Sequence, residues 1–233
     1  MMENINICYT REDIQTLSER ASKYGPLRNK LSLKIKEFLQ NHKYDWFLDN
    51  GTLLAAYRDN GKMIAWDDDF DMGVFFPNYP TDPCLVQKDG RKEKLLKQLN
   101  TFLEGTVYKA RPVSLNKENL DFDYAEKIEI YDPLYGTKPF RASNYYHVSL
   151  DIQFYTCVEN DVMICLHGSE GHLRCPLSAI FPTSKKLRYE GEWYQVPNDT
   201  LTFLESKYGY LGYDCKYNVE THLYEKRKSC ETK

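Results

Sequence analysis

Acidic side chains are concentrated in one short stretch of the chain, residues 66–73, which reads WDDDFDMG. If this stretch is a strand, its side chains alternate between two faces, and Asp67, Asp69 and Asp71 share one of them. Two carboxylates two positions apart on a strand lie about 6–7 Å apart at Cα, close enough for both to bind one cation. Without a cation, such crowding destabilises the fold. Oxygen ligands favour hard cations, so the pattern predicts a site for Mg²⁺ or Mn²⁺.

A second stretch, residues 147–154 (HVSLDIQF), alternates in the same way between polar and apolar side chains. Asp151 is thereby a single carboxylate on a strand whose opposite face is apolar. If the two strands are neighbours, Asp151 completes the site of Asp69 and Asp71, either as a metal ligand or as a general base. The spacing alone does not establish that they are neighbours.

A glycine-containing turn, residues 50–54 (NGTLL), lies between a predicted strand and a predicted helix. Backbone N–H groups at a helix start suit a phosphate, and glycine lets the backbone approach it closely. Gly51 and Thr52 are therefore candidate phosphate ligands. Arg58 and Lys62, between this turn and the carboxylates, are either further phosphate ligands or surface charges.

The elements that must position these residues follow from hydrophobic periodicity and turn signals. Helices are predicted over residues 11–23, 27–39, 53–58, 95–103 and 200–208, with Gly25-Pro26 ending the first and Asn198 capping the last. Strands are predicted over residues 45–50, 70–76, 107–111, 127–131, 146–155 and 162–166, with a hairpin around Glu190-Gly191. Because helices and strands do not alternate regularly, the expected fold class is α+β.

Composition excludes several classes of protein. The 233 residues include 31 basic and 34 acidic side chains, and the net charge of −3 argues against nucleic-acid binding by counterion release. No apolar run reaches the roughly 18 residues of a membrane span. The first residues lack the features of a signal peptide, and a glycan on the sequon Asn50-Gly51-Thr52 would block the turn. We therefore expect a cytoplasmic protein, or one of the secretory lumen if the chain is truncated. Seven cysteines, an odd number, indicate free thiols.

The sequence resembles the LicD/fukutin family of the polymerase-beta-like nucleotidyltransferase superfamily. The resemblance lies in residues 49–58 (DNGTLLAAYR), 64–71 (IAWDDDFD), 181–182 (FP), 187–191 (LRYEG), 196–198 (VPN) and 203–209 (FLESKYG). It implies an α+β nucleotidyltransferase-fold mixed sheet flanked by helices, with a β-rich C-terminal extension. It also implies residues 1–30 as an N-terminal helical segment, 31–160 as the catalytic core and 161–233 as an extension completing the same domain.

The resemblance also implies a chemistry. Asp69 and Asp71 match the paired metal carboxylates of the superfamily, Asp151 matches the third, and Gly51 and Thr52 match the turn that holds the nucleotide phosphates. Family members are phosphotransferases that use CDP-linked donors such as CDP-choline or CDP-ribitol. They transfer the phospho-alcohol to a glycan hydroxyl and release CMP.

Two departures from the family pattern, Ala65 for the usual Pro and Ala55 for the usual Gly, leave the carboxylates intact. Two other functions stay open. Asp69-Phe70-Asp71 is also a D-x-D motif, typical of metal-dependent glycosyltransferases that use nucleotide sugars and release UDP or GDP. In the second alternative, the chain is a non-catalytic relative that binds glycans or a partner protein.

A separate cluster of possible zinc ligands occurs late in the chain. Its members are Cys165, His167, His172 and Cys175. Their types and spacing could bind zinc, and the same residues also fit a plain hairpin that turns at residues 168–171. Both interpretations stay open.

Overall fold

The computed structural model describes residues 11–78, 90–113, 127–137, 145–157, 162–165, 175–218, 220–221 and 223–227. Within these residues, seven strands form one mixed sheet in the order β1-β2-β5-β4-β3, with β6 pairing with β5 and β7. The strands are β1 (Asp45–Leu48), β2 (Asp71–Phe75), β3 (Lys109–Val113), β4 (Lys127–Tyr131), β5 (Ser149–Cys157), β6 (Val162–Cys165) and β7 (Cys175–Pro176). Strands β2 and β5 are parallel, and the other neighbours are antiparallel. The expected mixed sheet is confirmed.

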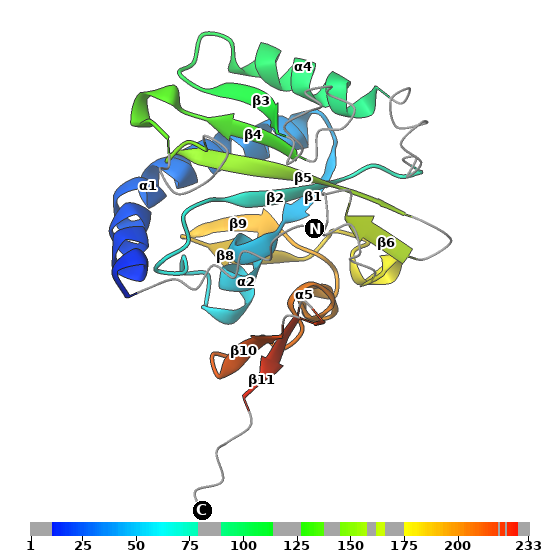
Figure 1. The fold of residues 1–233 in the computed structure, drawn as a ribbon. Coiled ribbons are helices and arrows are strands. Elements are labelled where there is room, and N and C mark those ends of the chain that lie inside the picture. Colours follow the sequence, from blue (N-terminus) through cyan, green and yellow to red (C-terminus); the bar gives the residue numbers. More distant parts are fainter. Residues whose placement is uncertain are drawn as a thin grey trace, which may run out of the picture.

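One face of the sheet belongs to the hydrophobic core. Met72 and Val74 of β2 and Ile152 and Phe154 of β5 are fully buried, as their alternation predicted. Helix α1 (Arg11–Asn41) packs against β5, and α4 (Arg91–Leu103) packs against β3. Figure 1 shows α1 running behind the sheet and α4 lying beyond β3. Burial of the apolar side chains on one face of β2 and β5 fixes the register of these strands. The alternate, polar side chains therefore lie on the opposite face of the sheet.

Helix α2 (Asn50–Arg58) contacts β2 and also β8 (Lys186–Tyr189), which forms a hairpin with β9 (Glu192–Gln195). Helix α5 (Thr200–Tyr208) contacts α2 and also β11 (Leu223–Lys226), which pairs with β10 (Cys215–Asn218). Two short 3₁₀ helices, η2 (Pro133–Tyr135) and η4 (Leu177–Ala179), complete the described elements. In Figure 1 the β10–β11 hairpin lies beside α5, toward the C-terminus.

No helix among the described residues combines the length and the apolar character needed to cross a lipid bilayer.

The predicted helix end at Gly25-Pro26 is wrong, because α1 continues through Pro26 to Asn41. Proline removes one backbone donor from a helix, but the residues that follow, including Arg28 and Leu31, are almost completely buried. This packing stabilises the continuous helix, and the expected domain boundary after residue 30 falls inside it. Figure 1 shows α1 changing direction along its length, as a helix with an internal proline commonly does.

Two further expectations differ from the structure. The acidic strand begins only at Asp71, so Asp67 and Asp69 lie in the preceding loop. The cap of the last helix is Asp199 instead of Asn198, because the Asp199 carboxylate accepts the N–H of Thr202 at 3.1 Å.

Part of the possible zinc site lies outside the described residues, so the zinc prediction stays a prediction. His167 and His172 lie outside the described residues, as does the loop that carries them. Of the described cysteines, Cys157, Cys175 and Cys215 are free thiols.

Candidate active site

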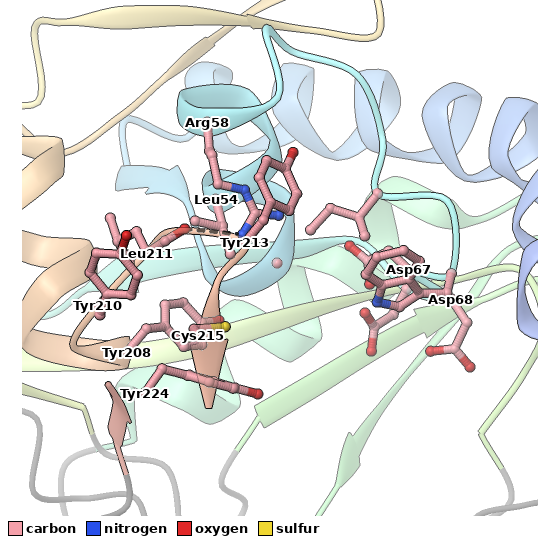
Figure 2. Close-up of a pocket in the computed structure, with 14 residues that line it drawn as sticks. Leu54, Arg58, Asp67, Asp68, Tyr208, Tyr210, Leu211, Tyr213, Cys215 and Tyr224 are labelled. Carbon is pink, nitrogen blue, oxygen red and sulfur yellow. Dashed lines mark hydrogen bonds between the residues drawn. The ribbon is translucent and has the colours of Figure 1, made fainter. Parts of the chain in front are cut away.

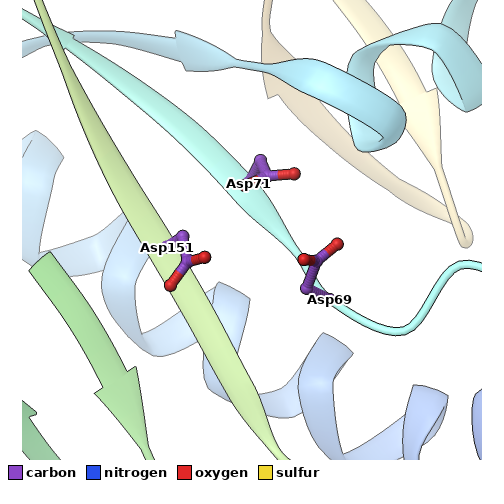
Figure 3. Close-up of side chains that lie close together, drawn as sticks. All are labelled: Asp69, Asp71 and Asp151. Carbon is purple, nitrogen blue, oxygen red and sulfur yellow. The ribbon is translucent and has the colours of Figure 1, made fainter. Parts of the chain in front are cut away.

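Three carboxylates converge where the parallel strands β2 and β5 lie side by side (Figure 3). Asp71 begins β2 and is the register partner of Asp151 on β5, and Asp69 lies just before β2. One carboxylate oxygen from each residue lies within 4.8 Å of the other two. Asp71 and Asp151 are buried, with 5% and 1% of their surfaces exposed. The structure therefore brings together the three residues that were predicted as metal ligands.

Negative charge accumulates at this point of the sheet. Burial raises the pKa of Asp71 well above its usual range, and the charges of Asp69 and Asp151 raise it further. A pKa raised in this way means that the ionised carboxylates destabilise one another when no counterion is present. A divalent cation with a preference for oxygen ligands, such as Mg²⁺ or Mn²⁺, would relieve this repulsion.

Two neighbouring side chains compensate part of the charge. The ammonium group of Lys127 on β4 forms a buried ion pair with Asp151 Oδ2. Burial lowers the pKa of Lys127, but the charges of Asp151 and Asp71 outweigh it and raise the pKa overall. Gln153 Nε2 donates a hydrogen bond to Asp71 Oδ1 at 3.4 Å.

The second carboxylate oxygen of Asp151, Oδ1, takes no part in the ion pair with Lys127. Asp151 Oδ1 is buried and has no hydrogen-bond partner among the described residues. A buried oxygen without a hydrogen-bond partner destabilises the folded state unless it binds a cation or accepts a hydrogen bond. The cluster thus fits a hard metal ion, with Asp151 Oδ1 as the oxygen that Lys127 leaves available.

The glycine-containing turn holds β2 in place from one side. Asp49 caps α2, because its carboxylate accepts the N–H of Asn50 at 2.7 Å. Thr52 is completely buried, and its Oγ1 accepts the backbone N–H of Asp71 at 3.0 Å. The side chain of Thr52 therefore positions Asp71 and lies away from any surface that a phosphate could reach.

Gly51, by contrast, borders the acidic loop directly. A Cβ at this position would lie 2.8 Å from Asp67 Oδ2, an oxygen with no hydrogen-bond partner among the described residues. Burial raises the pKa of Asp67 well above its usual range, and the charge of Asp69 adds to the shift. Arg28 of α1 donates to the backbone carbonyls of Asp67 and Asp69 at 3.2 and 3.4 Å. The loop before β2 is thus held between α1 and α2, and Asp67 lies beside the carboxylate cluster.

A buried polar network connects α5 to the start of α2. Lys207 Nζ lies 2.8 Å from Asp49 Oδ1 and donates to the hydroxyl of Tyr155 at 2.8 Å. Tyr155 donates in turn to Asp49 Oδ2 at 2.5 Å. Gly73 of β2 makes room for this arrangement, because a Cβ there would lie 3.0 Å from the Tyr155 ring. The network fixes the residue that caps α2, and through α2 it supports the turn beside the carboxylates.

A cavity of about 440 Å³ opens beside the acidic loop (Figure 2). Asp69 is the member of the carboxylate cluster that lines it, together with Gly51 of α2. Its aromatic lining consists of Trp66, Tyr208, Tyr210, Tyr213 and Tyr224. In Figure 2, Tyr208, Tyr210 and Tyr224 lie on the opposite side of the view from Asp67 and Asp68, and Tyr213 lies between the two groups. A cavity of this size, with aromatic walls and a polar end, is typical of small-molecule sites.

The four predicted phosphate ligands are thus separated by the fold. Gly51 and Arg58 line the cavity, whereas Thr52 is buried behind it and Lys62 is exposed outside it. The guanidinium of Arg58 is already paired, since its Nε and Nη2 donate to the two carboxylate oxygens of Asp59, each at 3.0 Å.

Several residues of the site were not anticipated from the sequence. Lys127 had a local signal, because Lys127 and Glu129 alternate with two isoleucines on a predicted strand and so share a face. Arg28 and Lys207 had none, because each acts on residues more than 35 positions away in the chain.

Comparison with known proteins places the chain in a family context. Residues 43–199 match the family model described as LicD/FKTN/FKRP, nucleotidyltransferase domain. No curated protein matches the chain. A solved structure titled "Structure of E. coli MS115-1 CdnC + ATP" shares 12% sequence identity with it at a TM-score of 0.34, covering 70% of this chain and 46% of that one. The chain thus spans less than half the length of that protein, and a TM-score of this size does not establish a common fold.

Proposed function

The chain belongs to the LicD/FKTN/FKRP family of nucleotidyltransferase domains, and we propose that it is a metal-dependent phosphotransferase. In this proposal it transfers a phospho-alcohol, such as phosphocholine or ribitol phosphate, from a CDP-linked donor to a glycan hydroxyl. The observation that carries the proposal is the register pair Asp71 and Asp151, with Asp69 beside them, at the edge of a cavity large enough for a nucleotide.

Asp69, Asp71 and Asp151 are the proposed ligands of Mg²⁺ or Mn²⁺. A bound ion would neutralise the diphosphate of the donor and the negative charge that develops on it during transfer. Three features support this assignment: the mutual proximity of the carboxylates, the raised pKa of Asp71, and the unpartnered Oδ1 of Asp151.

The protein groups have separate tasks in the transfer. The acceptor hydroxyl, positioned beside the carboxylate cluster, releases its proton to water as its oxygen forms a bond to the phosphorus that carries the alcohol. The bond from that phosphorus to the CMP oxygen breaks. Lys127 holds Asp151 by its other oxygen, so that Oδ1 stays available to the proposed ion. The backbone at Gly51 lies close to the departing phosphate, at the start of α2, where N–H groups favour negative charge.

The proposal extends to the organisation of the chain. Residues 31–160 would form the catalytic core and residues 161–233 would complete the same domain. This arrangement is consistent with α5, which supplies Lys207 to the network behind α2. The preceding residues to position 30 would act as a support, since Arg28 holds the acidic loop.

A panel of donors tests the proposal. The full chain is incubated with CDP-choline, CDP-ribitol and several UDP- and GDP-sugars, each with Mg²⁺ or Mn²⁺, and the released nucleotides are separated by chromatography. We expect CMP from a CDP-linked donor only when metal is present. Release of UDP or GDP would instead identify a glycosyltransferase, and release of no nucleotide from any donor would indicate a non-catalytic binding protein.

A further inference from the structure

We propose that the segment after α5, residues 209–215, together with Tyr224 of β11, forms the subsite for the nucleoside end of the donor, and that Tyr213 and Tyr224 stack on its base. This inference rests on the proposed function and adds a substrate contact to it. The residues concerned lie beyond position 199, where the match to the family model ends.

The cavity has two chemically different ends. Asp67 and Asp68 lie on one side of the view in Figure 2, and the next residue, Asp69, belongs to the carboxylate cluster, where the diphosphate of a donor would bind. The side chains that line the cavity from the segment after α5 are mainly tyrosines, together with Leu211 and Cys215. A nucleotide that places its phosphates at the carboxylates therefore directs its base toward the tyrosines.

Two of these tyrosines present large ring surfaces. Tyr213 is 72% exposed and Tyr224 is 39% exposed, although both line the cavity. Trp66, from the acidic loop, is 50% exposed and borders the same space. Partly exposed aromatic rings that line a cavity are the usual platforms for nucleobases, because every base has a flat face to stack on them.

Arg58 holds this wall to the catalytic core. Its guanidinium lies 4.3 Å from the centre of the Tyr213 ring and donates to the carbonyl of Leu211 at 3.3 Å. The Tyr213 hydroxyl donates to Asp59 Oδ1, the carboxylate that also pairs with Arg58. Figure 2 shows Arg58, Tyr213 and Leu211 grouped at one side of the cavity. These contacts assign Arg58 the task of positioning Tyr213, in place of the phosphate contact that the sequence suggested.

The rest of the wall is anchored to α5. Tyr210 N–H donates to the carbonyl of Tyr224 at 2.8 Å, which joins the segment after α5 to β11. Gly209 permits this close approach, since its φ is +74° and a Cβ there would lie 2.6 Å from the same carbonyl oxygen. Backbone contacts therefore place Tyr224 in this wall.

Equilibrium binding, measured by calorimetry on the full chain, tests the assignment. The ligands are CMP, UMP, AMP and GMP, and separately phosphocholine and ribitol 5-phosphate. The variants are Tyr213→Ala, Tyr213→Phe and Tyr224→Ala. The matched control is Tyr57→Ala on α2, because Tyr57 is 42% exposed, close to the exposure of Tyr224, but does not line the cavity.

We expect the wild type to bind at least one nucleoside monophosphate, and Tyr213→Ala and Tyr224→Ala each to weaken that binding tenfold or more. Tyr213→Phe keeps the ring and should stay within a few-fold of the wild type, as should Tyr57→Ala. Unchanged nucleotide affinity in both alanine variants would overturn the inference while leaving the proposed function intact. Loss of phosphocholine or ribitol phosphate binding without loss of nucleotide binding would also overturn it. Failure of the wild type to bind any nucleotide would contradict the proposed function itself.

Discussion

The hydroxyl oxygen of Thr52 accepts a hydrogen bond from the backbone N–H of Asp71 at 3.0 Å, and both residues are buried. The contact joins the first turn of α2 to the first residue of β2. A residue that the sequence suggested as a phosphate ligand thus sets the position of a carboxylate. Small shifts of catalytic groups have large effects on rate, so this contact bears on activity as well as on stability.

Replacing Thr52 by Val keeps the shape of the side chain but removes the acceptor. The buried N–H of Asp71 is then unsatisfied, which costs about 1–3 kcal/mol. We expect the free energy of unfolding in urea to fall by this amount, and the turnover number to fall more than the donor KM rises, because Thr52 does not line the cavity. Thr52→Ser retains the hydroxyl and should recover most of the turnover. Equal turnover in the Val and Ser variants would contradict the positioning role.

Replacing Lys207 by Met leaves the carboxylate of Asp49 buried without its cation. Removing one partner of a buried ion pair costs about 3–5 kcal/mol, and we expect chemical denaturation to show a loss of this size. In the double variant Asp49→Asn/Lys207→Met the loss should be smaller than the sum of the two single losses, because the partners are coupled.

Lys216→Met is the matched control for Lys207→Met. Lys216 pairs with Glu225 at 3.9 Å, and both side chains are about half exposed. Exposed ion pairs contribute about 0–1 kcal/mol. If Lys207→Met were as stable as Lys216→Met, the buried network would have no part in holding α2.

The described cysteines should differ in their reaction with iodoacetamide. Burial raises the pKa of Cys175 to about 11, so only about 1 in 1,000 of its thiols is ionised at pH 8. Its alkylation, followed by peptide mass spectrometry, should be slow at pH 8 and accelerate as the pH rises toward 11. Cys215 is partly exposed and lines the cavity, so it should react faster and be protected by the released nucleotide. Equal rates for Cys175 and Cys215 at pH 8 would refute this prediction.

Asp71→Asn should stabilise the protein when metal is removed with EDTA. The substitution deletes one of three crowded charges, and the raised pKa of Asp71 shows that burial and the neighbouring carboxylates disfavour that charge. We expect a melting temperature in EDTA equal to or above that of the wild type. Mn²⁺ should then raise the melting temperature of the wild type and have little effect on the variant, because only the wild type retains the full ligand set. A variant that Mn²⁺ stabilises as strongly as the wild type would rule out Asp71 as a ligand.

Much of the carboxylate site could be predicted from alternation alone. In residues 147–154 every second residue is apolar, and burial of those residues against α1 and α4 forces Asp151 onto the opposite face. The same alternation of side chains holds in β2 from Asp71 onward. Alternation could not place Asp67 and Asp69, because they lie in a loop whose backbone is held by Arg28 of α1.

The other supporting contacts could not be predicted, because they join residues far apart in the chain. The Asp49–Lys207 pair bridges α2 and α5, and the Asp151–Lys127 pair bridges β5 and β4. Gly25-Pro26 failed as a helix stop for a related reason, since burial of the residues after it outweighs the lost hydrogen bond. Local patterns predicted most of the elements and the residues of the carboxylate cluster, whereas the tertiary fold determines which side chains hold them in place.

The most direct test of the central claim is the rate of CMP release from a CDP-linked donor by Asp71→Asn at saturating Mn²⁺. The control is Asp45→Asn, which removes an exposed carboxylate at the start of β1. Loss of a metal ligand should reduce the rate at least about 100-fold relative to the wild type and the control, a change of about 2.7 kcal/mol in the barrier. Release of CMP by Asp71→Asn at the wild-type rate would contradict the account.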